Sequence, residues 1–147
     1  LAVKNTGMVV TTDLVDNLSD IHPSYKWKVG QRLALAALKE TYGNKTVLSS
    51  GPKFSSLKYK GNTIILSFSS IGGGLMSSDG QPLSWFTIAG EDGKFVPATA
   101  VIEGNKIIVS SPEVAKPSQV RFAWDEKAQP NLVNKEGLPA WPFRTGQ

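Results

Sequence analysis

Residues 54–69, FSSLKYKGNTIILSFS, contain two strand-like runs separated by Gly61 and Asn62. A Gly-Asn pair between two such runs is typical of a β-hairpin, because both residue types tolerate the positive φ angles of a tight turn. The stretch therefore predicts two antiparallel strands and indicates that the surrounding part of the chain is built from β-sheet.

Further strand-like segments follow this hairpin. Residues 95–111, FVPATAVIEGNKIIVSS, use the same Gly-Asn turn chemistry, although two hairpins with one turn solution do not make a repeat. PLSWFTIAG (82–90) is turned by Glu-Asp-Gly (91–93), which is ordinary turn chemistry, and QVRFAW (119–124) adds another strand. Short strands with regular turn signals predict a small antiparallel β-sandwich of about six or seven strands.

Two other segments of this part are less regular. SIGGGLMSSDG (70–80) has three consecutive glycines but lacks the Lys-Ser/Thr of a phosphate-binding loop, so we predict a flexible loop between strands. The tail NLVNKEGLPAWPFRTG (131–146) mixes prolines and glycines with large apolar residues, and we expect it to pack along a surface. Trp85 and Trp124 are predicted to pack in the core or on a sheet face, and Trp141 is a candidate interdomain anchor.

The first part of the chain has a different pattern. TGMVVTTDL (6–14) contains an apolar run typical of a central parallel strand, buried on both faces. A helix of about five turns is predicted to begin near Pro23 and to stop at Gly43, with an apolar face formed by Tyr25, Val29, Leu33 and Ala36. We therefore predict an α/β strand–loop–helix piece over residues 1–45 and an all-β domain over residues 46–147.

Composition excludes several classes of protein. The 147 residues carry a formal charge of +4, but the basic residues are scattered singly, without the clustered stripe that nucleic acid requires. No apolar run approaches the length of a membrane span. The absence of cysteine excludes a disulfide framework and a thiol nucleophile.

His22, the only histidine, lies on the loop between the predicted strand and the helix, which is where open α/β sheets place their active sites. An imidazole there can act as general base toward a serine if a carboxylate holds its second nitrogen, and Asp13, Asp16 and Asp20 are near enough in sequence. The alternative is that His22 merely contacts the start of its helix. One histidine among loosely spaced aspartates is no recognisable metal-ligand set, so we expect no metal or cofactor.

The stretch TTDLVDNLSDIHPSYKWKVGQRLALAAL (11–38) resembles the last catalytic block of the SGNH (GDSL-like) hydrolases, in the branch that includes sialate O-acetylesterases. The strings FTIAGEDGKFVPATAVIEGNKIIVSSP, VRFAW and NLVNKEGLPAWPFRT resemble the β-sandwich that follows the catalytic domain in bacterial members of that branch. The resemblance covers nearly the whole chain.

The resemblance implies the carboxyl-terminal part of a serine esterase that removes O-acetyl groups from sialic acid or a related sugar, in the periplasm or outside the cell. It assigns His22 as general base and Asp20 as its carboxylate. The family usually spaces this pair Asp-x-x-His, whereas Asp20 and His22 are two apart, so Asp16 stays as a rival. The family's nucleophilic serine block is absent, so this chain alone is predicted to be inactive and to associate with the missing catalytic portion or with itself. A non-catalytic carbohydrate-binding or docking module is the alternative.

Overall fold

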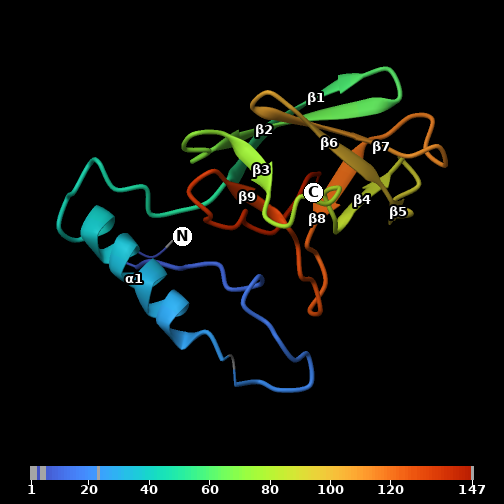
Figure 1. The fold of residues 1–147 in the computed structure, drawn as a ribbon. Helices are drawn as coiled ribbons and strands as arrows, with labels where there is room; N and C mark the ends of the chain where they lie inside the picture. Colours follow the sequence, from blue (N-terminus) through green and yellow to red (C-terminus); the bar gives the residue numbers. More distant parts are fainter. Residues whose placement is uncertain (1–2, 4–5, 23, 147) are drawn as a thin grey trace.

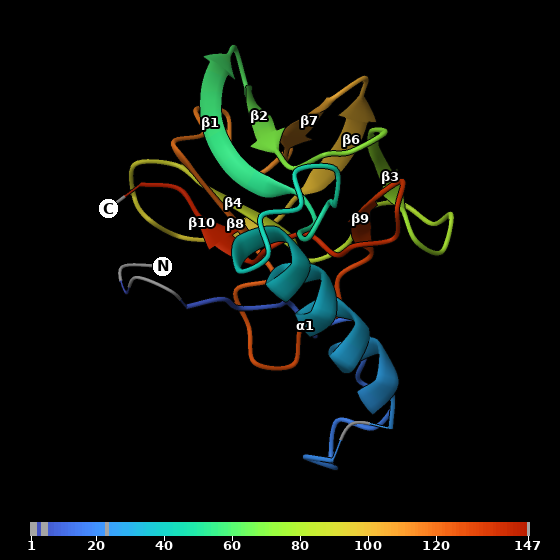
Figure 2. The same ribbon diagram turned by 90° about the vertical axis from the view of Figure 1, so that its left-hand side faces the viewer.

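The computed structural model describes residues 3, 6–22 and 24–146, and within them the chain forms one helix and ten strands. The fold is mostly antiparallel β-sheet with a single helix, α1 (Lys26–Glu40). Figures 1 and 2 both show α1 lying outside the sheets, joined to them by the connection that leads into β1.

The first four-stranded sheet has the order β1-β2-β7-β6. It contains β1 (Lys53–Lys60) paired with β2 (Thr63–Ser69), and β6 (Thr99–Glu103) paired with β7 (Lys106–Ser110). Both Gly-Asn hairpins predicted from the sequence are thereby confirmed, and β2 pairs with β7 to join them side by side.

The second four-stranded sheet has the order β10-β8-β4-β5. Its strands are β4 (Phe86–Ala89), β5 (Val96–Pro97), β8 (Gln119–Phe122) and β10 (Phe143–Arg144). A small third sheet pairs β3 (Leu75–Ser77) with β9 (Leu132–Asn134). The described residues thus form more strands than the sequence predicts, because β3, β5, β9 and β10 are only two or three residues long and carry little pattern.

Both four-stranded sheets contribute to one hydrophobic core. In β2 and β7 alternate residues are buried, and β4 and β8 bury theirs against them. Their fully buried members include Ile64, Leu66, Ile88, Ile107 and Val120. This period-two burial is what a strand with one covered face produces.

The glycine-rich segment differs from the predicted flexible loop. It contains β3, and Leu75 is buried in the core. The Gly73 N–H donates a hydrogen bond of 2.8 Å to the Glu136 carboxylate, and a Cβ atom at Gly72 would overlap that carboxylate. The glycines therefore make room for an acidic side chain of this same chain.

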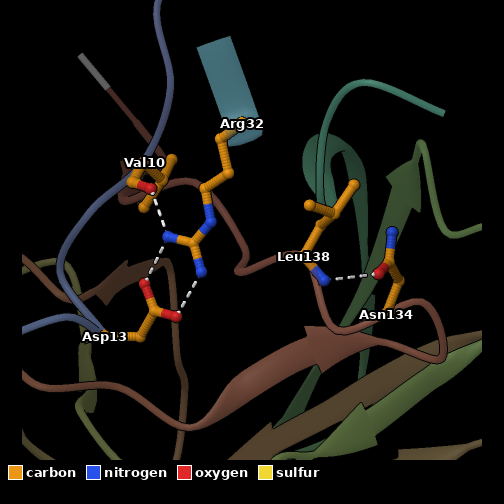
Figure 3. A network of polar contacts seen from close by, with 5 residues as sticks. All are labelled: Val10, Asp13, Arg32, Asn134 and Leu138. Carbon is orange, nitrogen blue, oxygen red and sulfur yellow. Dashed lines mark hydrogen bonds and ion pairs between the residues drawn. The ribbon is translucent and has the colours of Figure 1, made fainter. Parts of the chain in front are cut away.

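The tail also differs from its prediction, because it fills the core instead of lying along a surface. Leu132, Ala140 and Phe143 are core residues, and the buried Asn134 accepts a hydrogen bond from the Leu138 N–H (Figure 3). The turn between β9 and Leu138 is held by this side chain, which has 0% of its surface exposed.

Trp85 and Trp124 do not pack in the core, since the two residues are 41% and 52% exposed, whereas the Trp124 ring lies 5.5 Å from the Cζ atom of Arg144 on β10. Trp85 has φ 62° and the facing Ala123 has φ 50°. Positive φ angles at non-glycine residues turn the side chain away from the regular alternation of a strand. The positive φ angles could not be predicted from the pattern of apolar residues in the sequence.

The first forty-five residues agree with the sequence in part. The helix is present but spans Lys26–Glu40, shorter than five turns, and Pro23 lies outside the described residues. Residues 6–14 form no strand, because a parallel strand exists only beside hydrogen-bonded neighbours and the described chain places none there. Within the helix Arg32 is buried, whereas Leu33, expected on the packed face, is exposed.

Gly51 provides a stability test, because a Cβ atom there would overlap the backbone carbonyl oxygens of Leu138 and Pro139. We expect Gly51→Ala to lower the free energy of unfolding by about 1–3 kcal/mol, since backbone atoms cannot swing aside. Gly30→Ala is the matched control: its Cβ would meet open space in α1, so it should raise helix stability by up to about 1 kcal/mol. Urea unfolding measures both variants. A free energy of unfolding in Gly51→Ala equal to that of the wild type would contradict the close approach of Gly51 to the Leu138 and Pro139 carbonyls.

Asp79 provides a pH test. Hydrogen bonds from the Ser77 hydroxyl, the Gln81 N–H and the Asn131 amide lower the pKa of Asp79 to about 2. An unfolded aspartate has a pKa of about 3.9, so the stabilisation is complete above that pH and is lost as the pH falls through about 2. Denaturant unfolding from pH 5 to pH 2 should therefore show a steeper loss of stability in the wild type than in Asp79→Asn. Asp125→Asn, in an exposed turn, is the control, and parallel curves for Asp79→Asn and the wild type would refute the prediction.

Candidate functional site

Asp20 and His22 contact each other directly. The Nδ1 atom of His22 lies 2.9 Å from the Oδ1 atom of Asp20, and the backbone N–H of His22 donates to the same oxygen at 2.8 Å. The His22 side chain is 75% exposed, and the Asp20 side chain is 50% exposed. The sequence-predicted pair is thus brought together by the fold.

The contact is a product of local turn chemistry. An aspartate side chain readily accepts the backbone N–H two residues on, which forms an Asx-turn. Asn17 makes the same turn with the Ser19 N–H at 2.9 Å, and the Asp20 N–H donates to the Asn17 carbonyl at 3.1 Å. The two-residue spacing therefore suits the contact, because the Asx-turn points the carboxylate back at the imidazole.

Electrostatics favour an ionised Asp20. The backbone N–H of His22 first, and the His22 side chain second, lower the pKa of Asp20. A carboxylate on Nδ1 selects the tautomer with hydrogen on Nδ1, which leaves Nε2 with its lone pair available. The arrangement can accept a proton at Nε2 from a group outside the loop.

Asp13, one of the rival carboxylates, is engaged elsewhere. The guanidinium of Arg32 donates to both Asp13 oxygens, at 2.7 and 2.6 Å, and to the Val10 carbonyl at 2.6 Å (Figure 3). The Arg32 and Asp13 side chains are only 8% and 21% exposed. This fork ties α1 to the segment that precedes the His22 loop, and sequence analysis missed it because the partners are nineteen residues apart.

Asp16, the other rival, forms no hydrogen bond or ion pair with His22 among the described residues. It lines a hollow of about 270 Å³ together with Asp20, Ile21 and Glu126. The Gln129 amide donates to the Val15 carbonyl at 3.1 Å, so the loop after β8 lies against the base of the His22 loop. Glu126 and Gln129 are neighbours of the candidate site that no sequence signal indicated, since they are more than a hundred residues away from it.

Serines near sheet edges have structural roles. The Ser50 hydroxyl accepts the Trp141 indole N–H at 2.8 Å, and the Ser77 hydroxyl donates to Asp79 at 2.7 Å. In the part of the chain that the structure describes, no serine hydroxyl forms a hydrogen bond with His22.

Residues 3, 6–22 and 24–146 contain no group of three or more His, Cys, Asp or Glu side chains that could hold a metal ion. Their helix is too short and too polar to cross a bilayer.

Comparison with known proteins shows a similarity to solved structures. No protein-family model matches the chain, and no curated protein matches it. Among solved structures, the chain is similar to a carbohydrate acetylesterase from Xanthomonas citri, with 43% sequence identity and a TM-score of 0.86. The match covers 91% of this chain but 31% of the other, so this chain spans about a third of that enzyme's length.

The coverage is greater than the length of the sheets alone, so part of the helical segment belongs to the match. A likeness of this extent supports a common fold over the matched residues.

The Arg32–Asp13 fork can be tested directly. We expect Arg32→Ala to reduce the hydrogen-exchange protection of the Leu14 N–H, which donates to the Thr11 carbonyl within the tethered segment. A double-mutant cycle with Asp13→Ala should give a coupling free energy of roughly 0.5–3 kcal/mol. Lys39→Ala, on the same helix, is the control, and unchanged protection in Arg32→Ala would refute the tether.

Proposed function

We propose that this chain is the carboxyl-terminal portion of an SGNH-type carbohydrate esterase that removes O-acetyl groups from sialic acid or a related sugar. The observation that carries the proposal is the hydrogen-bonded Asp20–His22 pair with Nε2 available, in a chain 43% identical to part of a carbohydrate acetylesterase. An aspartate–histidine contact occurs in many kinds of protein, and the match assigns no role to any residue of this chain. The two observations therefore support the proposal only together.

In the proposed reaction His22 acts as general base. Its Nε2 takes the proton of a serine hydroxyl supplied by the amino-terminal portion, and the serine oxygen attacks the acetyl carbonyl. Asp20 holds the Nδ1–H and stabilises the imidazolium that forms. His22 then returns the proton to the departing sugar oxygen, and water releases the acetyl group by the same sequence.

The proposal divides the chain at the boundary that the sequence analysis predicts. Residues 1–45 are the last strand–loop–helix piece of the catalytic α/β domain, in which residues 6–14 gain strand neighbours from the missing portion. Residues 46–147 are the β-sandwich that follows it. The enzyme works in the periplasm or outside the cell, in keeping with a substrate carried on glycans.

The partner of residues 1–45 is the missing catalytic portion. Large apolar side chains are exposed on α1 and on the segment before it, among them Met8, Trp27, Leu33 and Leu38. Several large apolar side chains exposed on one short segment are seldom left in water. It supports burial against another body, either the catalytic portion or a second copy.

The alternative is a carbohydrate-binding or docking module without catalysis. The exposed indoles of Trp85 and Trp124 favour it, because exposed aromatic faces stack on sugar rings. Glycan binding by the chain, together with an activity of the assembled protein that does not depend on His22, would select this alternative.

Activity tests the catalytic proposal. In a protein that joins this chain to a serine-bearing amino-terminal portion, His22→Ala should lower kcat on an aryl acetate by a factor on the order of 10³, because triad members act as a unit. Asp20→Ala should lower kcat as well, whereas Asp16→Ala should not, since Asp16 forms no hydrogen bond or ion pair with His22 among the described residues.

The 147-residue chain alone is expected to hydrolyse no acetyl ester, because a base without a nucleophile and an oxyanion hole retains little catalysis. A loss of tenfold or less in His22→Ala of the joined protein would remove His22 from the mechanism.

The exposed apolar side chains generate a second test. We expect the isolated chain to self-associate or to leave residues 6–42 weakly protected, because their packing surface is missing. Analytical ultracentrifugation and hydrogen exchange measure both properties. A strictly monomeric chain with strong amide protection across residues 6–42 would contradict the proposed partner, and addition of the catalytic portion should raise the protection.

A further inference from the structure

The second sheet carries two arginines opposite each other. Phe122 and Phe143 are buried in the core, so the next residue on β10, Arg144, and the preceding residue on β8, Arg121, project from the other face. β10 and β8 pair with Arg144 directly opposite Arg121. Like charges at directly opposed positions destabilise a sheet. Charge interactions between these two strands therefore do not account for this pair.

Neither guanidinium is neutralised by a described residue. The ion pairs of residues 3, 6–22 and 24–146 are His22–Asp20 and Arg32–Asp13, on other elements. The Nε atom of Arg121 is shielded from solvent and has no hydrogen-bond partner. A shielded donor without an acceptor costs free energy, so the placement of Arg121 is not explained by its hydrogen bonds within this chain.

Aromatic rings hold both arginines in place. The Cζ atom of Arg121 lies 3.7 Å from the centre of the Phe95 ring, and that of Arg144 lies 5.5 Å from the Trp124 ring. Stacking on a ring fixes the plane of a guanidinium and leaves its N–H edges free to donate. We call these four residues, Phe95, Arg121, Trp124 and Arg144, the arginine–aromatic patch.

We propose that the arginine–aromatic patch binds a saccharide that carries a carboxylate, such as an oligouronate. Planar guanidinium edges match the two oxygens of a carboxylate, and such charge-assisted hydrogen bonds are among the stronger ones. The exposed half of the Trp124 indole offers a flat apolar surface for the adjoining sugar ring. Nucleic acid is disfavoured, because a polyanion needs a run of phosphate contacts and the basic residues of this chain are scattered.

This site lies on the β-sheet part and does not depend on His22 chemistry. Binding is therefore measured with the 147-residue chain itself, by isothermal titration with trigalacturonate and with its methyl ester. The ester keeps the sugar rings and removes the charges. We expect the acid to bind at least about tenfold more tightly than the ester, because only the acid offers oxygens with full charge to both arginines.

Variants locate the site. Arg144→Gln and Trp124→Ala should each weaken trigalacturonate binding about tenfold, and Arg144→Lys should restore only part of the loss, because lysine lacks the planar fork. Lys106→Gln, an exposed cation on β7 of the first sheet, is the matched control and should bind as the wild type does. Circular dichroism verifies that each variant is folded.

Three results would overturn the proposal. The first is equal affinity for the acid and the ester, which would show that the carboxylates do not contribute to binding. The second is wild-type affinity in folded Arg144→Gln, which would show that the arginine–aromatic patch is not the binding site. The third is tighter binding of a single-stranded oligonucleotide than of trigalacturonate, which would show that the patch prefers a polyanion to a saccharide.

Discussion

The ring of Phe143 holds the two large sheets together. Its centre lies 4.9 Å from that of Phe54 and 5.8 Å from that of Phe68, both in the first sheet, and 5.6 Å from that of Phe122 in the second. Burial of such a side chain contributes roughly 1.5–3 kcal/mol. Phe143 belongs to the last few residues of the chain, so the core is complete only when the tail has docked.

The same tail fixes the connection to the helix. The Trp141 backbone N–H donates to the Pro52 carbonyl at 2.9 Å, its indole N–H donates to Ser50, and Gly51 lies against Leu138 and Pro139. Trp141 also borders a small cavity lined by Val10 and Arg32, where the fork to Asp13 begins. A chain of contacts therefore runs from the core through the tail and α1 to the segment that carries Asp20 and His22. Trp141 thus contacts the connection between α1 and β1, and its role as an interdomain anchor stays a prediction.

Sequence patterns predicted the features that are formed by residues close together along the chain. The two Gly-Asn hairpins and the Asp20–His22 contact are decided within a few residues, so the sequence contains their whole cause. The Glu136 contact with Gly73 spans 63 residues, and that of Gln129 with Val15 spans 114. Nothing in the local pattern distinguishes such a glycine loop from a flexible one.

Another error came from treating apolar character as burial. Leu33 is exposed although it was expected on the packed face of the helix, and its neighbour Arg32 is buried, because Arg32 binds a carboxylate and a carbonyl.

The exposure of the Asp20–His22 pair has a chemical consequence. In water the attraction between an imidazolium and a carboxylate is weak, and a side chain that is 75% exposed samples many positions. A general base gains its advantage from fixed orientation and from a low dielectric around the developing charge. The backbone N–H of His22 fixes the carboxylate but not the ring. A second body that covers this loop would supply both missing conditions at once, because it would restrict the ring and exclude water. The same body would bury the apolar side chains of α1, so a single docking event would satisfy the stability of the helical segment and the chemistry of the pair.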